Sequence, residues 1–241
     1  MKSRNSSPNA AKKGGNTLTV QYILLVLLKG SVGFAGLFAF ASFFEWTLHK
    51  YVMHSLLWNY PFQAHALVHH GLFRADQSYH LRREEDKPKV TFAWWNAPGL
   101  LLLHLPLLLG LGHLYGWPVF WGGLAALSSY YALYESLHFC MHVPQNRWIE
   151  QTRVFQWLNA HHHLHHRYAF KNLNVVFPLA DWVLGSLVPA QATNNPGGET
   201  LSYRTLPHPV PLPSRERDRV RECSVRERFA ARIVGGLRGH E

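Results

Sequence analysis

The sequence predicts an all-α fold, a multi-pass membrane helical bundle of three to four transmembrane helices with a cytosol-facing helical cap. The first observation is that apolar residues, 47% of the 241-residue chain, are concentrated in the nearly uncharged segments 18–44, 92–112 and 115–134. A transmembrane helix needs about 20 mostly apolar residues, and each segment is long enough. The second observation is that the sequence between these segments is polar and rich in histidine.

The first apolar segment, 18–44, is interrupted by Lys29-Gly30-Ser31. It is either one long tilted helix or a hairpin of two short helices. Each arm of a hairpin would hold only about a dozen apolar residues, which is short for a full crossing. We therefore favour one long helix that continues to residue 54. Residues 1–16, rich in Ser, Asn, Lys and Gly, are expected to form a disordered basic tail.

Segments 92–112 and 115–134 are expected to form a membrane hairpin, because only a short turn joins them. Since a hairpin returns the chain to the side from which it entered, the polar residues on its two flanks face one compartment. These polar stretches are expected to be helices and loops of the cap. The membrane domain is expected to span 17–190, and the Arg-rich segment 191–241 to be a basic, disordered tail.

The net charge of +10 comes mainly from the two tails and from residues 74–89. We interpret this charge as a positive-inside bias with attraction to anionic lipid. One long first helix would nevertheless put the Lys-rich N-terminus on the side opposite the cap, whereas a hairpin of two short helices would put it on the same side. We expect an integral multi-pass protein of a bacterial inner membrane or the endoplasmic reticulum, with the cap on the cytoplasmic side. No nucleic-acid partner is expected, because no recognised module is visible and half the chain is apolar enough for lipid.

Fifteen of the seventeen histidines lie between residues 49 and 166, mostly in four tight clusters at the ends of apolar segments. The clusters are His49-x4-His54, His65-x3-His69-His70, His138-x3-His142 and the run 161–166, which contains the triplet His162, His165 and His166. Neutral imidazole suits zinc, iron, copper and nickel. Packing alone does not explain such a set, so the clusters predict a metal site in the cap, at the membrane surface.

The spacing within the clusters indicates two ions. Residues four apart on an α-helix are separated by about 40°, so His65 with His69, and likewise the two members of the third cluster, are expected to share a face. Adjacent residues are separated by about 100°, which suits two ions side by side. His49 and His54 fit two neighbouring ions, or a helix that ends between them. The ten expected ligands are His49, His54, His65, His69, His70, His138, His142, His162, His165 and His166.

Four further residues are candidates for supporting these ligands. Glu45 precedes His49 by four residues, and Glu135 precedes His138 by three. Either carboxylate could accept the second ring N–H of a ligating histidine, which would fix its tautomer and raise its basicity. Asn174 and Asp181 are candidates for the same role. The alternative for each carboxylate is a solvated helix end.

Five other histidines are treated separately. His104 and His113 are not expected to be ligands. His161 and His163 are less favoured than the triplet, and whether they or His80, which lies close in sequence to the second cluster, also bind metal is left open.

The ordered set HxxxxH, HxxxHH, HxxxH and HxxHH, divided by a membrane hairpin, resembles the fatty acid hydroxylase/sterol desaturase superfamily over about residues 40–190. The stretch 45–54 is similar to the first histidine box of the carotenoid hydroxylases in that superfamily. The segment with Asn174, Pro178, Asp181 and Gly185 is also similar to the family's. The resemblance implies an O2-dependent oxidoreductase, a non-haem di-iron oxygenase whose ten histidines bind two iron ions (or zinc in purified protein).

The implied reaction is hydroxylation or desaturation of a C–H bond in a lipid: a fatty acyl chain, a sterol or a carotenoid. O2 is the implied co-substrate. The sequence shows no haem-attachment motif, flavin fingerprint or iron–sulfur pattern. A separate cytochrome, ferredoxin or reductase is therefore expected to supply electrons, and residues 74–89 could dock an acidic donor or lipid headgroups.

A function from another class is a histidine-rich membrane metal carrier or transporter without redox catalysis. Such a protein needs polar residues along its spans to form an ion path, whereas these spans hold mainly Leu, Gly and aromatic residues. A bis-histidine haem protein would need histidines deep within facing spans, and only His104 is placed in that way. Zinc protease chemistry has no support because the chain contains no HExxH.

Overall fold

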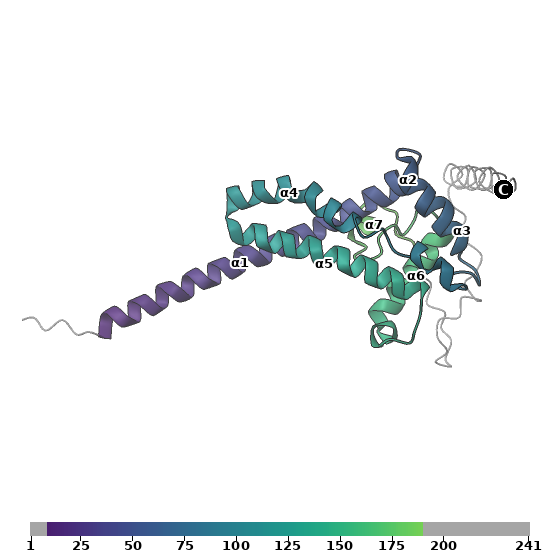
Figure 1. Cartoon of the computed structure of the whole chain (residues 1–241). Coiled ribbons are helices and arrows are strands. Elements are labelled where there is room, and N and C mark those ends of the chain that lie inside the picture. Colours follow the sequence, from purple (N-terminus) through teal and green to yellow (C-terminus); the bar gives the residue numbers. More distant parts are fainter. Residues whose placement is uncertain (1–8, 190–241) are drawn as a thin grey trace, which may run out of the picture. The chain divides into compact units, whose positions relative to one another are not determined.

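The computed structural model describes residues 9–189, and every regular element in that part of the chain is a helix. The all-α prediction is therefore confirmed, while the predicted tail 191–241 lies outside the described residues. The elements, shown in Figure 1, are α1 (Asn9–Thr47), η1 (Leu48–Met53), α2 (Asn59–Phe62), η2 (Gln63–His69), α3 (His70–Leu72), η3 (Glu84–Lys89), α4 (Asn96–Tyr115), α5 (Trp117–His142), η4 (Trp148–Gln151), α6 (Arg153–Arg167) and α7 (Leu179–Val183).

Helix α1 is one continuous α-helix of 39 residues that passes through Lys29-Gly30-Ser31 without a break. Glycine within a helix costs only about 1 kcal/mol relative to alanine, which many apolar neighbours with high helix propensity can offset. The helix begins at Asn9, so it includes residues 9–16, which the sequence assigns to the tail. Of the two alternatives for the first apolar segment, the long helix is the one observed.

Two helices among the described residues are long and apolar enough to cross a membrane: Thr19–Met53 and Asn96–Tyr115. Helix α5 contains the third expected span but is not among them, because its serines, tyrosines and tryptophans reduce its hydropathy. Two apolar helices are consistent with membrane association. A bundle of three to four spans stays a prediction.

The described chain divides into two compact units. The first consists of residues 9–40 and 94–131, and the second of residues 41–93 and 132–189. The first unit therefore holds α4, most of α1 and the first half of α5. The second holds the end of α1, the rest of α5 and all of the other helices.

Helices of the first unit pack closely through glycine. A Cβ atom on Gly122 would lie 2.0 Å from the Gly30 carbonyl oxygen, and one on Gly33 would lie 2.6 Å from that of Val119. The backbones of α1 and α5 thus approach at a distance that only glycine permits, which is common where membrane helices meet. Helix α4 runs beside the first half of α5 (Figure 1), where Gly112 contacts Phe120.

The second unit contains two small apolar cores. Trp46, Leu173 and Ala180 form one, and Phe73, Val90 and Val143 form the other. The first core joins the end of α1 to α7 and to the loop that precedes it. The second core joins the segments on either side of η3 to the residue that follows α5. Together they bring segments that are distant in sequence to the histidines of η1, η2, α3, α5 and α6.

Candidate metal centre

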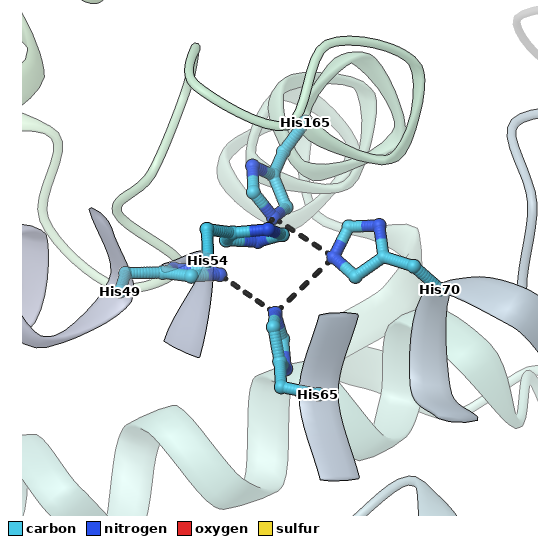
Figure 2. A group of neighbouring side chains, drawn as sticks. All are labelled: His49, His54, His65, His70 and His165. Carbon is cyan, nitrogen blue, oxygen red and sulfur yellow. Dashed lines mark hydrogen bonds between the residues drawn. The ribbon is translucent and has the colours of Figure 1, made fainter. Parts of the chain in front are cut away.

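The structure brings the ten expected histidines together in two groups of five. Group I consists of His49, His54, His65, His70 and His165, and group II consists of His69, His138, His142, His162 and His166. Within each group the potential ligand atoms lie within 4.8 Å of one another, and every ring is buried or half-buried. In Figure 2 the rings of group I turn their nitrogens toward a common centre. These buried clusters can each hold a metal ion.

Helical geometry explains how adjacent histidines reach different groups. His69 belongs to group II and His70 to group I, and His165 and His166 are divided in the same way. A rotation of about 100° per residue separates each adjacent pair. The i,i+4 pairs of α5 and α6 both fall within group II, as their shared helix faces predict. The two groups are close neighbours, since the rings of His70 and His166 stack with centroids 4.2 Å apart.

The π-helices η1 and η2 account for two departures from expectation. His65 joins His70 in group I rather than His69, and His49 and His54 both belong to group I rather than to two ions. The His54 N–H donates to the His49 carbonyl at 3.0 Å, and the His70 N–H donates to the His65 carbonyl. This i→i+5 bonding defines a π-turn. It brings histidines five residues apart onto one side, where α-helical angles would separate them.

The distances between ring nitrogens match those around a metal ion. In group I the Nε2 atom of His65 lies 2.9 Å from that of His49 and 3.2 Å from that of His70. In group II the Nε2 atom of His162 lies 3.2 Å from that of His142 and 3.0 Å from that of His166. Two nitrogens about 2.1 Å from one ion, at right angles, are separated by about 3.0 Å. The observed spacing therefore corresponds to edges of a coordination polyhedron.

Backbone carbonyls set the tautomer of six of these histidines. The Nδ1–H of His138 donates to Val90 O at 2.9 Å, and that of His142 to Tyr79 O at 2.8 Å. A neutral imidazole has one N–H, so in each case Nε2 keeps its lone pair and faces the group centre. The remaining pairs are His49 with Leu173 O, His69 with Lys89 O, His165 with Lys171 O and His166 with Phe73 O.

Several of the inward-facing nitrogens are left without a proton donor. The Nε2 atoms of His69 and His138 are buried and have no hydrogen-bond partner. Those of His142 and His166 both face His162 Nε2, and a single proton there cannot serve both. Buried polar atoms in proteins are nearly always paired. A cation at the centre of group II would satisfy these lone pairs, so the residues fit a metal ion.

Burial keeps the histidines in the neutral form that metal binding requires. It lowers the pKa of His69 to about 4. Burial, followed by repulsion from neighbouring histidines, holds the pKa of His65, His70 and His166 well below the usual range. Protons therefore do not compete for these lone pairs near neutral pH.

Backbone carbonyls, rather than the expected carboxylates, accept the second N–H of His49 and His138. Glu45 instead accepts from the Val175 N–H at 2.6 Å and from Asn174 Nδ2 at 3.0 Å. Glu135 accepts from the Phe92 N–H at 3.4 Å. Both carboxylates thus bind the backbone segments that contain the acceptor carbonyls, and those carbonyls, not the carboxylates, accept the Nδ1–H of each ring.

Asp181, in α7, is the centre of a buried network that includes the loop before this helix. Its carboxylate accepts from Leu173 N at 2.9 Å, Asn174 N at 2.8 Å, Ser186 Oγ at 2.6 Å and His161 Nε2 at 3.1 Å. Burial alone would raise the pKa of the Asp181 carboxyl, but these hydrogen bonds lower it overall. His161 thus lies outside both groups.

The other histidines named from the sequence also lie outside the two groups. His163 and His80 pack against the ring of Tyr79, and His104 contacts Phe40 within the first unit. The sequence did not predict a role for Tyr79. Its carbonyl accepts from His142 Nδ1, and its ring packs against that of His142 with centroids 4.7 Å apart. A lone tyrosine in a polar stretch carries no sequence signal for such a role.

No protein-family model, curated protein or solved structure matches the chain.

Proposed function

We propose that the chain is a membrane-bound non-haem di-iron oxygenase that uses O2 and external electrons to hydroxylate or desaturate a C–H bond of a lipid. One observation carries the proposal: two adjacent groups of five buried histidines, each with nitrogens converging on a centre. The order and spacing of the histidine clusters, which resemble those of the fatty acid hydroxylase/sterol desaturase superfamily, support it.

The number of ligands favours iron. Structural zinc is almost always four-coordinate, and catalytic zinc uses three protein ligands. Five imidazoles in each group suit an octahedral ion and leave one position for another ligand. Bound iron would supply the activation of O2, while the chain supplies the ligand geometry and a dry site. Purified protein that has taken up zinc is compatible with this assignment.

The lipid substrate and the membrane location are supported by the two apolar helices Thr19–Met53 and Asn96–Tyr115. A cytochrome, ferredoxin or reductase would provide the electrons from the cytoplasmic side, since the sequence shows no redox motif of its own. A fatty acyl chain, a sterol and a carotenoid are all substrates that a lipid-exposed site could admit.

The test is expression of the full chain with a donor system, followed by metal determination and lipid mass spectrometry with and without O2. We expect two bound ions and an O2-dependent product that has gained one oxygen atom or lost two hydrogen atoms. His70→Ala in group I and His166→Ala in group II should each reduce the metal content and abolish the product. His113→Ala, outside both groups, is the matched control and should change neither.

Full metal retention with unchanged products in both variants would overturn the di-metal site. Two bound ions without any O2-dependent product would overturn the oxygenase and favour a metal carrier.

A further inference from the structure

The peptide group between Leu173 and Asn174 is hydrogen-bonded at both ends. Its carbonyl oxygen accepts from His49 Nδ1 at 2.5 Å, and its N–H donates to Asp181 Oδ2 at 2.8 Å. Asp181 and both residues of the peptide are fully buried. A continuous chain of bonds therefore runs from a carboxylate through one peptide group to the imidazole of a group I histidine.

Three other peptide groups also accept a hydrogen bond from a histidine of group I or II through their carbonyl oxygen. In each of them the N–H of the same peptide group donates to a neutral acceptor. Behind the Lys171 carbonyl, the Asn172 N–H donates to Ser186 O at 3.1 Å. Behind the Phe73 carbonyl, the Arg74 N–H donates to Ser78 Oγ at 3.4 Å. Behind the Lys89 carbonyl, the Val90 N–H donates to Lys87 O at 3.2 Å. Among these four described peptides, only that of Leu173 is backed by a carboxylate.

The carboxylate should alter the imidazole through the peptide. Hydrogen bonds to an ionised acceptor are roughly twice as strong as neutral ones, and bonds in a chain polarise one another by about 10–30% each. A polarised Leu173 carbonyl is a stronger acceptor for the Nδ1–H of His49. The electron density at Nε2, and so its strength as a metal ligand, rises in consequence.

We propose that Asp181 is a positioning residue for group I, acting through the Leu173–Asn174 peptide to orient His49 and strengthen it as a metal ligand. The Lys89 and Phe73 peptides, which hold two histidines of group II, lack such a carboxylate, so this support is expected to act on group I. The inference rests on the proposed metal binding, but it requires neither iron nor any reaction with O2.

The test is zinc affinity, measured on the detergent-solubilised full chain by competition with a chelator. Asp181→Asn keeps the shape of the side chain but cannot accept all four donors. We expect it to lower the affinity for one of the two zinc ions by about 10–100-fold, the usual effect of losing a partner of a ligating histidine. The affinity for the other ion should stay within about twofold.

A double-mutant cycle separates this role from a general structural one. In a His49→Ala background, Asp181→Asn should cause no further loss of group I affinity beyond about twofold, because its route to the metal is already gone. In a His138→Ala background, which removes a group II ligand, the loss should persist in full. Equal weakening of both ions, or a loss that persists without His49, would overturn the inference.

A second variant keeps the inference falsifiable if Asp181→Asn does not fold. His161→Phe removes a donor that shares Asp181 Oδ2 and leaves the link to the peptide in place. Group I affinity should then be unchanged or higher, whereas a loss of about tenfold or more would contradict the inference. If the unmodified chain binds no zinc, the proposed metal site fails as well. Two bound ions with no effect of Asp181→Asn would refute this inference alone.

Discussion

At the scale of single residues, the histidines of groups I and II are bases that the fold keeps neutral. Burial lowers the pKa of His69 to about 4, and it lowers those of His65, His70 and His166 well below the usual range. In the unfolded chain the same rings would titrate near 6.5. Between these values the unfolded chain binds protons that the folded chain excludes.

The metal-free protein should therefore lose stability as the pH falls from about 6.5 toward 4. Over that window the unfolded state holds more protons, so the free energy of unfolding falls by about 1.4 kcal/mol per pH unit for each such histidine. Above 6.5 these groups should add no pH dependence. Urea unfolding in detergent with a chelator present, followed by tryptophan fluorescence, would measure this. A stability that is flat or rises on acidification would contradict it.

The residue scale also shows what sequence can and cannot indicate. Imidazole is a distinctive side chain, so all ten members of groups I and II could be named from spacing. Their hydrogen-bond partners could not, because every residue has a carbonyl and nothing marks Leu173 or Tyr79 as the one that meets a ligand. The prediction that Glu45 and Glu135 contact the rings was wrong in one respect. Both carboxylates lie near the histidines, but a backbone segment separates each of them from the ring.

At the scale of elements, two deviations from regular packing matter. The π-turns of η1 and η2 place histidines five residues apart on one side, which no α-helical pattern predicts. Glycines on α1 and α5 let two backbones come into contact. The regular parts of α5 and α6, by contrast, gave the i,i+4 pairs that α-helical geometry predicts.

Gly122→Ala should destabilise the first unit by about 1–3 kcal/mol, the usual cost of overpacking. Its Cβ would lie 2.0 Å from a backbone oxygen of Gly30, and backbone cannot move aside as a flexible side chain can. Gly36→Ala, on the facing helix α1, is the matched control. Nothing lies within 4 Å of the Cβ at that position, and alanine favours a helix.

Thermal unfolding in detergent, followed by circular dichroism, would compare the two glycine variants. Equal melting temperatures would mean that α1 and α5 do not pack as described.

At the scale of the whole molecule, the histidines of groups I and II come from parts of the second unit that are distant in sequence. Group II alone draws on η2, α5 and α6. An ion bound there would connect segments that are otherwise joined through small apolar cores and hydrogen bonds. Contacts between distant segments leave no local signal in the sequence. The prediction that these segments meet therefore depended on the assumption that their histidines share one metal site.

Metal should stabilise the fold against heat. An ion that binds the native state alone at 100 times its dissociation constant adds about 2.7 kcal/mol to the free energy of unfolding. We expect the melting temperature to rise with zinc or ferrous iron and to return to its initial value with chelator. The double variant His70→Ala and His166→Ala should show a much smaller rise. A melting temperature insensitive to metal in the unmodified chain would contradict binding to the native state.

The division of ligands between the two groups has a consequence for the order of events during synthesis. Four of the five histidines of group I lie within residues 49–70, and only His165 comes later. Group II has one histidine in that early segment and four in residues 138–166. The N-terminal part of a chain emerges first during synthesis, and short loops close more readily than long ones. We expect the first ion to be captured by a nascent chain that cannot yet bind the second.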